Sequence, residues 1–340
     1  MKNYVILLAV TLAACQPSKK NYTWDEFAID GEPSLRGISV LDKNVIWVSG
    51  TNGTVVKTEN GGVDWHEVYV PKSDSLDFRD VEVLSKTDVV LMSAGPGGKS
   101  NVFKTKDGGH HWQTVLINEY DSGFFDGMAF WNENEGILGG DPVEGKLFLM
   151  KTEDGGDSWR QIHPDHLPEI NEGEIGGFAA SGSHLSVKGN SAWVGTGAAT
   201  ARVFYTHDKG QHWEVVYTPI VQGESSTGIF SVDFLDEKNG VAVGGDYTKE
   251  DEVTEGVIVT KDGSQTWQLA SNFPVYQSAV RYLSKKELIS VGPSGCYRSS
   301  DKGMTWEPFG DSGFHTLAVA KDGTVWAAGR AGRIAQLIIK

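Results

Sequence analysis

The octapeptide TEDGGDSW, at Thr152–Trp159, is one of six copies of a single pattern in this chain. Each copy begins with Ser or Thr, has Asp or Asn third and usually Gly fifth, and ends with Trp. The copies, termed boxes below, are Thr58–Trp65, Thr105–Trp112, Thr152–Trp159, Thr206–Trp213, Thr260–Trp267 and Ser299–Trp306. A recurring unit of this size cannot bury its apolar face alone, so its copies must pack against one another.

The spacing of the boxes predicts the architecture. They begin at residues 58, 105, 152, 206, 260 and 299, and four short strands with their turns need about 40–45 residues, the period of a propeller blade. The first repeat contains four β-prone runs divided by turn residues, namely Leu35–Leu41, Val45–Ser49, Thr54–Thr58 and Trp65–Val70. No stretch shows a sustained helical period. The chain is therefore predicted to be an all-β propeller of four-stranded blades.

Six boxes still predict seven blades. After the last box come three further strand patterns, Phe314–Ala320, Thr324–Ala328 and Arg333–Ile339, and the chain then stops. The missing fourth strand is at the other end, where Tyr22–Phe27 matches the outer-strand pattern of Asp64–Val68. We expect an N-terminal outer strand to complete the last blade of a propeller spanning residues 22–340. Such closure removes exposed sheet edges and fixes both termini.

The first residues have the pattern of a targeting segment. Lys2 precedes an apolar stretch, Tyr4–Thr11, and Leu12-Ala13-Ala14 stands directly before Cys15. This arrangement resembles the bacterial lipobox, in which the Cys becomes the lipidated first residue; an ordinary secretory signal is the alternative. We expect a lipoprotein signal peptide at 1–14 and a lipidated tether at 15–21. By the same resemblance, Gln16 favours the outer membrane, with the protein on its periplasmic side.

Composition restricts the partners. The formal net charge is −15, and a surface of that sign repels nucleic acid and anionic lipid. We therefore expect no nucleic-acid partner and contact with the membrane only through the anchor. Net charge does not identify the partner; the arginines at the channel mouth and the family resemblance, both described below, lead us to expect a protein or an acidic ligand such as a glycan, bound by a monomer.

The boxes and their surroundings resemble the Asp-box (bacterial neuraminidase repeat) propellers. Within that group, Gly50–Thr58 and Phe234–Gly245 are similar to the repeat units of the family related to the photosystem II stability and assembly factor. The resemblance covers nearly all of the expected mature chain. It implies a seven-bladed propeller that acts as a binding or assembly module, and says little about the ligand.

Enzymatic alternatives find little support in the motifs. Gly195–Ala199 follows a strand pattern, but no helix follows to receive a dinucleotide pyrophosphate. No Cys or His cluster has metal-ligand spacing, so we expect neither cofactor nor metal. The Arg-containing strings Ser34–Gly37 and Asp77–Asp80 lack the Ile-Pro that follows Arg in sialidases, which are also six-bladed. A glycan-active hydrolase or lyase of sialidase-like type remains the alternative function, and whether the chain is an enzyme is left open.

A ligand site is expected at the mouth of the central channel, on the face opposite the boxes. Residues that enter the innermost strands there are Arg36, Arg79, Asp126, Phe178, Phe230, Arg281 and His315. Five of them precede a residue of the next strand by eleven positions and should stand at similar heights, namely Arg36, Arg79, Asp126, Phe230 and His315. Loops between second and third strands add candidates to the same face, among them Asp141, Arg202, Asp246 and Arg330.

Arginines on an inner strand need partners, because an unpaired charge in a narrow channel is costly. The carboxylates of Asp80, Asp126 and Asp141 are available, and one interpretation is a structural Arg/Asp network that closes the channel. The other is an anion-binding cup at which Arg36, Arg79 and Arg202 converge, for a peptide terminus, acidic glycan or phosphate. In either case we expect the arginines to lower the pKa of the channel carboxylates.

Overall fold

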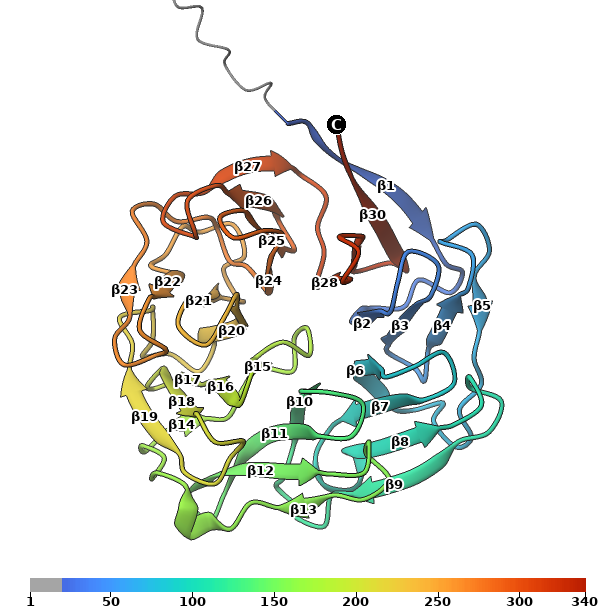
Figure 1. Ribbon diagram of the computed structural model, residues 1–340, viewed down its shortest axis with the longest axis horizontal. Helices are drawn as coiled ribbons and strands as arrows, with labels where there is room; N and C mark the ends of the chain where they lie inside the picture. Colours follow the sequence, from blue (N-terminus) through green and yellow to red (C-terminus); the bar gives the residue numbers. More distant parts are fainter. Residues whose placement is uncertain (1–19) are drawn as a thin grey trace, which may run out of the picture.

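The computed structural model describes residues 20–340, which form a closed ring of seven β-sheets (Figure 1). The sheets are antiparallel, and each follows the order of the chain from the channel outward, except at the closure. Helical structure within the described residues amounts to two 3₁₀ turns, η1 (Gly97–Lys99) and η2 (Pro164–His166). The predicted all-β, seven-bladed propeller is confirmed.

The first three blades follow the predicted repeat. Blade 1 contains β2 (Leu35–Val40), β3 (Ile46–Gly50), β4 (Val55–Thr58) and β5 (His66–Glu67). Blade 2 contains β6 (Asp77–Val83), β7 (Val89–Ala94), β8 (Asn101–Thr105) and β9 (Gln113–Ile117). Blade 3 contains β10 (Phe125–Phe130), β11 (Gly136–Val143), β12 (Lys146–Thr152) and β13 (Arg160–Gln161). The outer strand predicted at Trp65–Val70 is shorter, although the N–H of Val68 still donates to the Val55 carbonyl at 2.8 Å.

The next three blades carry one addition. Blade 4 contains β15 (Leu185–Lys188), β16 (Ser191–Gly195), β18 (Arg202–Thr206) and β19 (Glu214–Tyr217). Blade 5 contains β20 (Thr227–Phe234), β21 (Gly240–Asp246), β22 (Val257–Thr260) and β23 (Gln268–Leu269). Blade 6 contains β24 (Ala279–Tyr282), β25 (Leu288–Gly292), β26 (Gly295–Ser299) and β27 (Glu307–Gly310). Two short strands extend the sheet of blade 5 at its inner edge, β14 (Glu174–Ile175) and β17 (Gly197–Ala198).

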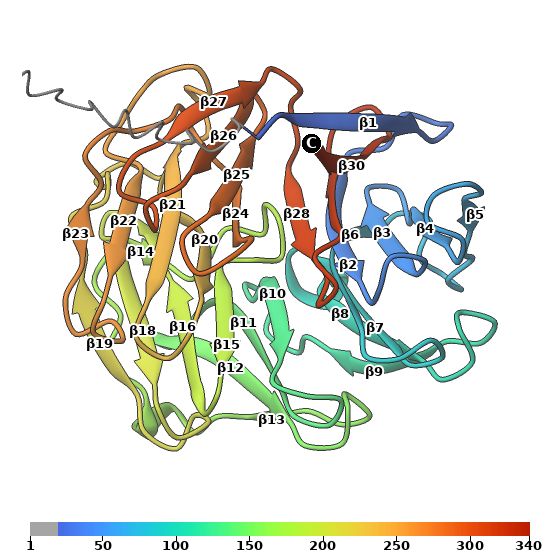
Figure 2. The ribbon, with the colours of Figure 1, turned by 45° about the horizontal axis from the view of Figure 1, so that its top comes forward.

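The seventh blade joins the two ends of the described chain. It contains β28 (Thr316–Val319), β29 (Val325–Ala328), β30 (Arg333–Ile339) and β1 (Tyr22–Ala28). β1 pairs with β30 over its whole length, from Tyr22 opposite Ile339 to Ala28 opposite Arg333 (Figure 2). Trp24 of β1 packs against Phe314 and Phe309. The predicted closure by an N-terminal outer strand is confirmed.

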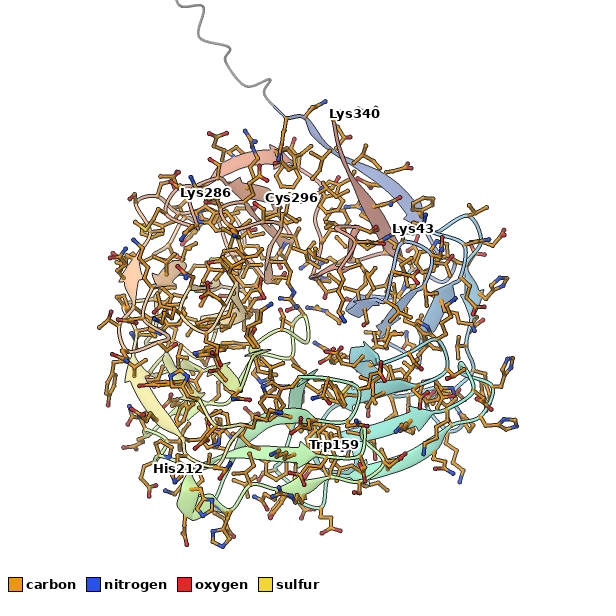
Figure 3. The ribbon with its side chains drawn as sticks, viewed as in Figure 1. Lys43, Trp159, His212, Lys286, Cys296 and Lys340 are labelled. Carbon is orange, nitrogen blue, oxygen red and sulfur yellow. The ribbon has the colours of Figure 1, made fainter. Side chains whose placement is uncertain are left out.

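The core lies between neighbouring blades. One cluster joins Trp47 of blade 1 to Leu91 of blade 2, and another joins Trp193 of blade 4 to Ile258 of blade 5. Figure 3 shows side chains filling the spaces between the sheets, with Trp159 of the third box packed where blades 2 and 3 meet. Burial of large apolar surface between blades therefore holds the ring together.

Each box is a self-contained turn on one face of the ring. In the third box, Thr152 Oγ1 donates to Asp154 Oδ1 at 2.8 Å and accepts the Gly156 N–H at 2.8 Å. The N–H of Ser158 then donates to Asp154 Oδ1 at 2.9 Å. These bonds satisfy the hydroxyl, the carboxylate and two N–H groups of the turn locally, as the sequence predicts for a structural element.

Candidate functional site

Between blades 3 and 4 the chain leaves the ring and crosses its central channel (Figure 1). The crossing segment, residues 176–184, is termed the plug. Its Ser181 accepts a hydrogen bond from Thr316 of blade 7 at 3.0 Å and donates to the carbonyl of Ser278, beside blade 6, at 2.8 Å. Ser183 bonds to Ser231 of blade 5 at 2.8 Å. The plug thus reaches several blades and closes the channel between its two mouths.

The plug is narrow because its residues are small. It is rich in Gly, Ala and Ser, and Phe178 is its one large apolar side chain. Gly182 has φ +67°, and a Cβ there would lie 2.5 Å from the Asp80 carboxylate of blade 2. Only glycine satisfies both the left-handed backbone and the close approach.

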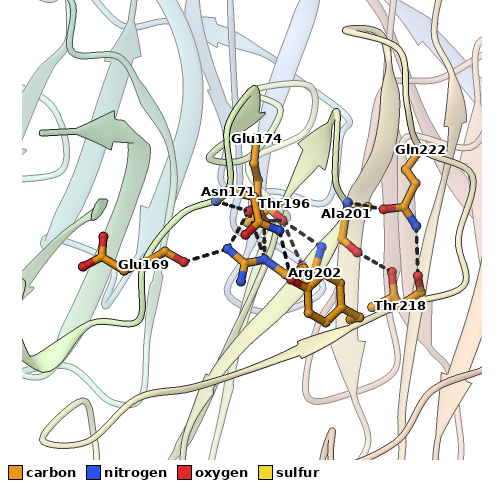
Figure 4. A network of polar contacts seen from close by, with 9 residues as sticks. Glu169, Asn171, Glu174, Thr196, Ala201, Arg202, Thr218 and Gln222 are labelled. Carbon is orange, nitrogen blue, oxygen red and sulfur yellow. Dashed lines mark hydrogen bonds and ion pairs between the residues drawn. The ribbon is translucent and has the colours of Figure 1, made fainter. Parts of the chain in front are cut away.

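A buried ion pair anchors the segment just before the plug (Figure 4). Arg202 of β18 donates from Nη2 to Glu174 Oε2 at 2.6 Å, and the side chains are 5% and 0% exposed. Thr196 Oγ1 donates to the same carboxylate at 2.5 Å, the Asn171 N–H donates to it at 3.0 Å, and Arg202 also donates to the Glu169 carbonyl at 2.8 Å. Arg202 is therefore held inside the protein through its Nε and Nη2 atoms.

A cavity of about 490 Å³ lies above the plug at the mouth opposite the boxes. This cavity is termed the cup. Its charged and polar lining includes Arg36, Arg79, Arg330, Asp126, Asp141, Glu250 and His315. Its aromatic lining includes Phe178, Phe230, Tyr247 and Tyr276. The five residues that share the eleven-residue spacing all line the cup.

β-bulges explain how four of those five residues reach the cavity. The register of the inner strand shifts at Arg36, Arg79, Asp126 and Phe230. A bulge bends its strand and re-aims a side chain. The equal spacing in the sequence thus marks the same irregularity in blades 1, 2, 3 and 5.

The cup arginines differ in their partners. Arg79 forms an ion pair with Asp77 and donates from Nη1 to the carbonyl of Ala179 in the plug at 2.7 Å. Arg36 donates to Ser34 Oγ at 3.3 Å and to the Ala180 carbonyl at 3.5 Å, and within residues 20–340 it has no carboxylate partner. Burial, together with the nearby charge of Arg79, lowers the pKa of Arg36 to about 10.

The cup carboxylates hold the plug. Asp126 accepts the Gly177 N–H at 3.0 Å, and Asp141 accepts the Gly176 N–H at 3.2 Å. Burial raises the pKa of both carboxyl groups, and the charge of Asp141 raises that of Asp126 further. The expectation of lowered pKa values is wrong for this pair, because loss of hydration outweighs the charge of Arg79 at Asp126 and the Gly176 hydrogen bond at Asp141.

Asp80 does not pair with the arginines. It lies buried behind the plug, where its carboxylate accepts the N–H groups of Val81 at 2.8 Å and Met128 at 2.7 Å. Burial raises its pKa as well, and the nearby Glu82 adds to the rise. The carboxylate that pairs with Arg79 is Asp77, which was not among the predicted partners, instead of Asp80.

The rim and wall of the cup come from the later blades. Arg330, in the loop after β29, forms an ion pair with Glu250 of the loop after β21. His315 is 2% exposed, and its Nε2 has no hydrogen-bond partner among the described residues. Burial lowers the pKa of His315, and Arg36 lowers it further. His315 is therefore a neutral side chain at neutral pH.

Three candidates from the sequence, Arg202, Asp246 and Arg281, lie outside the cup. Arg202 pairs with Glu174 just before the plug, so the expected convergence of Arg36, Arg79 and Arg202 is not found. Asp246 is 5% exposed and accepts the N–H of Thr248 at 3.0 Å, so it caps its own loop. Phe178 does line the cup, but from the plug and not from an inner strand. Arg281 is on the inner strand β24 but lines cavities on the box side of the ring.

Comparison with known proteins supports the fold. No protein-family model matches the chain, and no curated protein matches it in sequence. A structure of YCF48 bound to D1 peptide is 14% identical, covers 93% of this chain and 94% of its own, and has a TM-score of 0.67. YCF48 from Cyanidioschyzon merolae is 16% identical over 92% of this chain and 98% of its own, with a TM-score of 0.66. A streptogramin B lyase is 14% identical over 94% of this chain and 98% of its own, with a TM-score of 0.62.

Three further observations bear on cofactors and on location. Residues 20–340 contain no group of three or more His, Cys, Asp or Glu side chains placed to hold a metal ion. In the same part of the chain, no helix has the length and apolar character needed to cross a membrane. Cys15, the signal peptide predicted at 1–14 and most of the tether predicted at 15–21 lie outside the described residues.

Proposed function

We propose that this chain is a binding module of the bacterial cell envelope, and that its cup receives an acidic group of a partner protein. Arg36 carries the proposal, because it is a desolvated cation inside an open cavity with no carboxylate partner among the described residues. An unpaired buried charge is unfavourable, and binding an anion would relieve that cost.

The surrounding charges support this role for Arg36. Arg79 already pairs with Asp77, and Arg330 with Glu250. Arg36 is thus the cup guanidinium left for a ligand. The rigid ring and the plug below fix its position before any ligand arrives, which lowers the entropy lost on binding.

The structural neighbours are consistent with a protein partner. One of them is a propeller described as bound to a peptide, D1. Because this neighbour is only 14% identical to the chain, it shows only that such a ring can hold a segment of another protein. The boxes resemble Asp-box repeats of assembly factors, which is why an assembly role belongs to the proposal.

The proposal favours binding over glycan hydrolysis. A glycosidase needs one carboxyl group free to donate a proton and a second free to act on the sugar. Asp126 and Asp141 both accept backbone N–H groups of the plug. Both carboxylates are therefore occupied by bonds that hold the plug in place and are not free to act on a sugar.

Affinity capture with the full-length protein tests the proposal. Wild type, Arg36→Leu and the control Arg160→Leu would be used to capture envelope proteins, which quantitative mass spectrometry then identifies. Arg160 is an exposed arginine of β13 that pairs with Glu153 and does not line the cup. We expect a partner retained by wild type and Arg160→Leu but lost with Arg36→Leu. Equal capture by all three would exclude the cup as the binding site.

Anchoring through Cys15 is a separate part of the proposal. Substituting Cys15→Ser should move the protein from the membrane fraction to the soluble fraction and block lipid labelling. Continued membrane association of this variant, at the wild-type level, would refute the anchor and leave the cup unaffected.

A further inference from the structure

We infer that the cup selects a single carboxylate, received by Arg36 and His315, over phosphate, sulfate or any group with two negative charges. This inference rests on the proposed function and specifies the chemistry of its ligand. Arg36 supplies the charge, and His315 supplies a buried ring nitrogen, Nε2, with no partner in the described chain.

Charge counting favours a monoanion. Three arginines line the cup, but two of them are neutralised by Asp77 and Glu250, so one positive charge remains. Asp126 and Asp141 line the same cavity and repel negative charge whenever they are ionised. A carboxylate matches the single free guanidinium, whereas a dianion would bring a second charge toward those acids.

The histidine favours an oxygen ligand close to Arg36. Arg36 and His315 line the same cavity, and burial and the positive charge of Arg36 lower the pKa of His315. A neutral imidazole can still donate one N–H, so Nε2 can bond to one carboxylate oxygen while the guanidinium bonds to the other. The bond would satisfy a nitrogen that is otherwise buried without a partner.

The aromatic wall provides for the carbon skeleton of the ligand. Phe178 of the plug stacks on Phe230 with ring centroids 3.9 Å apart, and Tyr247 packs edge-on against both. Tyr276 completes the group, 4.8 Å from Phe230. An apolar or aromatic group next to the carboxylate would gain burial there, as ligands commonly do in mixed pockets. The carboxylate can come from a chain terminus or from an acidic side chain.

Calorimetric titration of the full-length protein tests the inference at pH 7. The probes are N-acetyl-phenylalanine, its amide, N-acetyl-glutamic acid α-amide and phenyl phosphate, which is mostly a dianion at this pH. We expect the two carboxylates to bind at least about tenfold more tightly than the amide and the phosphate. The stronger of the two carboxylates shows whether a chain terminus or a side chain is preferred.

Variants assign the effect to residues. Arg36→Leu should weaken carboxylate binding at least about tenfold, and His315→Phe should weaken it severalfold, while Arg160→Leu should bind as wild type does. Melting temperatures would establish that the variants are folded. Arg36→Lys, which keeps the charge but not the planar fork, covers the case in which Arg36→Leu does not fold, and it too should bind more weakly.

The outcomes separate this inference from the proposed function. Equal or tighter binding of phenyl phosphate that depends on Arg36 would overturn carboxylate selection and leave an anion-binding cup. Absence of binding by both carboxylates would overturn the inference even if partner capture depends on Arg36. Equal partner capture by wild type and Arg36→Leu would instead overturn the proposed function itself.

Discussion

Aspartates stand on both faces of the propeller, in the boxes and in the cup, and their surroundings act on them in opposite directions. In the third box partial burial opposes ionisation of Asp154, but hydrogen bonds from Ser158 and Thr152 outweigh it and hold its pKa at about 2. Hydrogen bonds within the turns also lower the pKa of the other box aspartates, Asp107, Asp208, Asp262 and Asp301. In the cup, burial raises the pKa of Asp126 and Asp141.

This difference separates the repeated scaffold from the candidate site within one ring. The boxes repeat, and in each the first hydroxyl bonds to the Asp or Asn within the turn. The cup does not repeat, and its charges are unevenly matched. Unmatched groups in a cavity are typical of binding sites. The predictions below test whether the two faces can be altered independently.

The largest effect is expected at the anchor of the plug. Arg202→Met leaves the Glu174 carboxylate buried without its partner, and breaking such a pair costs about 3–5 kcal/mol of stability. Urea denaturation would measure the loss. The double variant Arg202→Met/Glu174→Gln should recover part of it, since no charge is then left buried. A loss below about 1 kcal/mol for the single variant would contradict the anchoring role.

A pH-dependent effect is expected at Asp126. Its pKa in the folded state is raised above the unfolded value, so its contribution to stability is fully present at low pH and is lost as the pH rises through the folded pKa. Asp126→Asn can still accept the Gly177 N–H, and it removes that loss. We therefore expect this variant to exceed wild type in stability at pH 8 and to equal it near pH 3. Parallel stability profiles for the two proteins would show that burial does not control this carboxyl group.

A smaller and opposite effect is expected in the sixth box. Asp301→Ala removes an acceptor for the Thr305 N–H at 2.9 Å and for Ser299 Oγ at 2.8 Å, and should cost about 1 kcal/mol at pH 7. Because the folded pKa of Asp301 is lowered, this contribution exists above the unfolded pKa and disappears as the pH falls through the folded one. Binding of N-acetyl-phenylalanine should not change. Altered binding in this variant would mean that the two faces are coupled.

The sequence predicted the ring and most of the charged and polar lining of the cup for identifiable reasons. The boxes reveal the blades because each copy carries the same turn chemistry, and the eleven-residue spacing reveals Arg36, Arg79 and Asp126 because equivalent bulges keep equal distances. The plug was missed, because Gly, Ala and Ser in 176–184 have no period, and their bonds go to distant blades. The interval between the third and fourth boxes, which begin at 152 and 206, is longer than the two before it, but the next interval, from 206 to 260, is equally long and contains no plug.

The direction of the pKa shifts in the cup could not be predicted from residue types. Sequence placed acids beside arginines, and proximity alone lowers the pKa of an acid. The structure shows that Arg79 is engaged by Asp77 and that Asp126 is 2% exposed. Burial of this kind arises from the plug, so missing the plug also led to the wrong sign.

The smallest effect is expected at the rim, where Glu250 pairs with Arg330. Arg330 is 59% exposed, so the pair should add at most about 1 kcal/mol to stability. Glu250→Gln removes a negative charge from the cup and frees a second guanidinium, so N-acetyl-phenylalanine should bind about two- to fivefold more tightly. Glu153→Gln is the matched control, since it removes a carboxylate paired with Arg160 outside the cup. Calorimetry at low and high salt would check the origin, because an electrostatic gain diminishes as screening increases. Weaker binding by Glu250→Gln would show that this glutamate contacts the ligand itself.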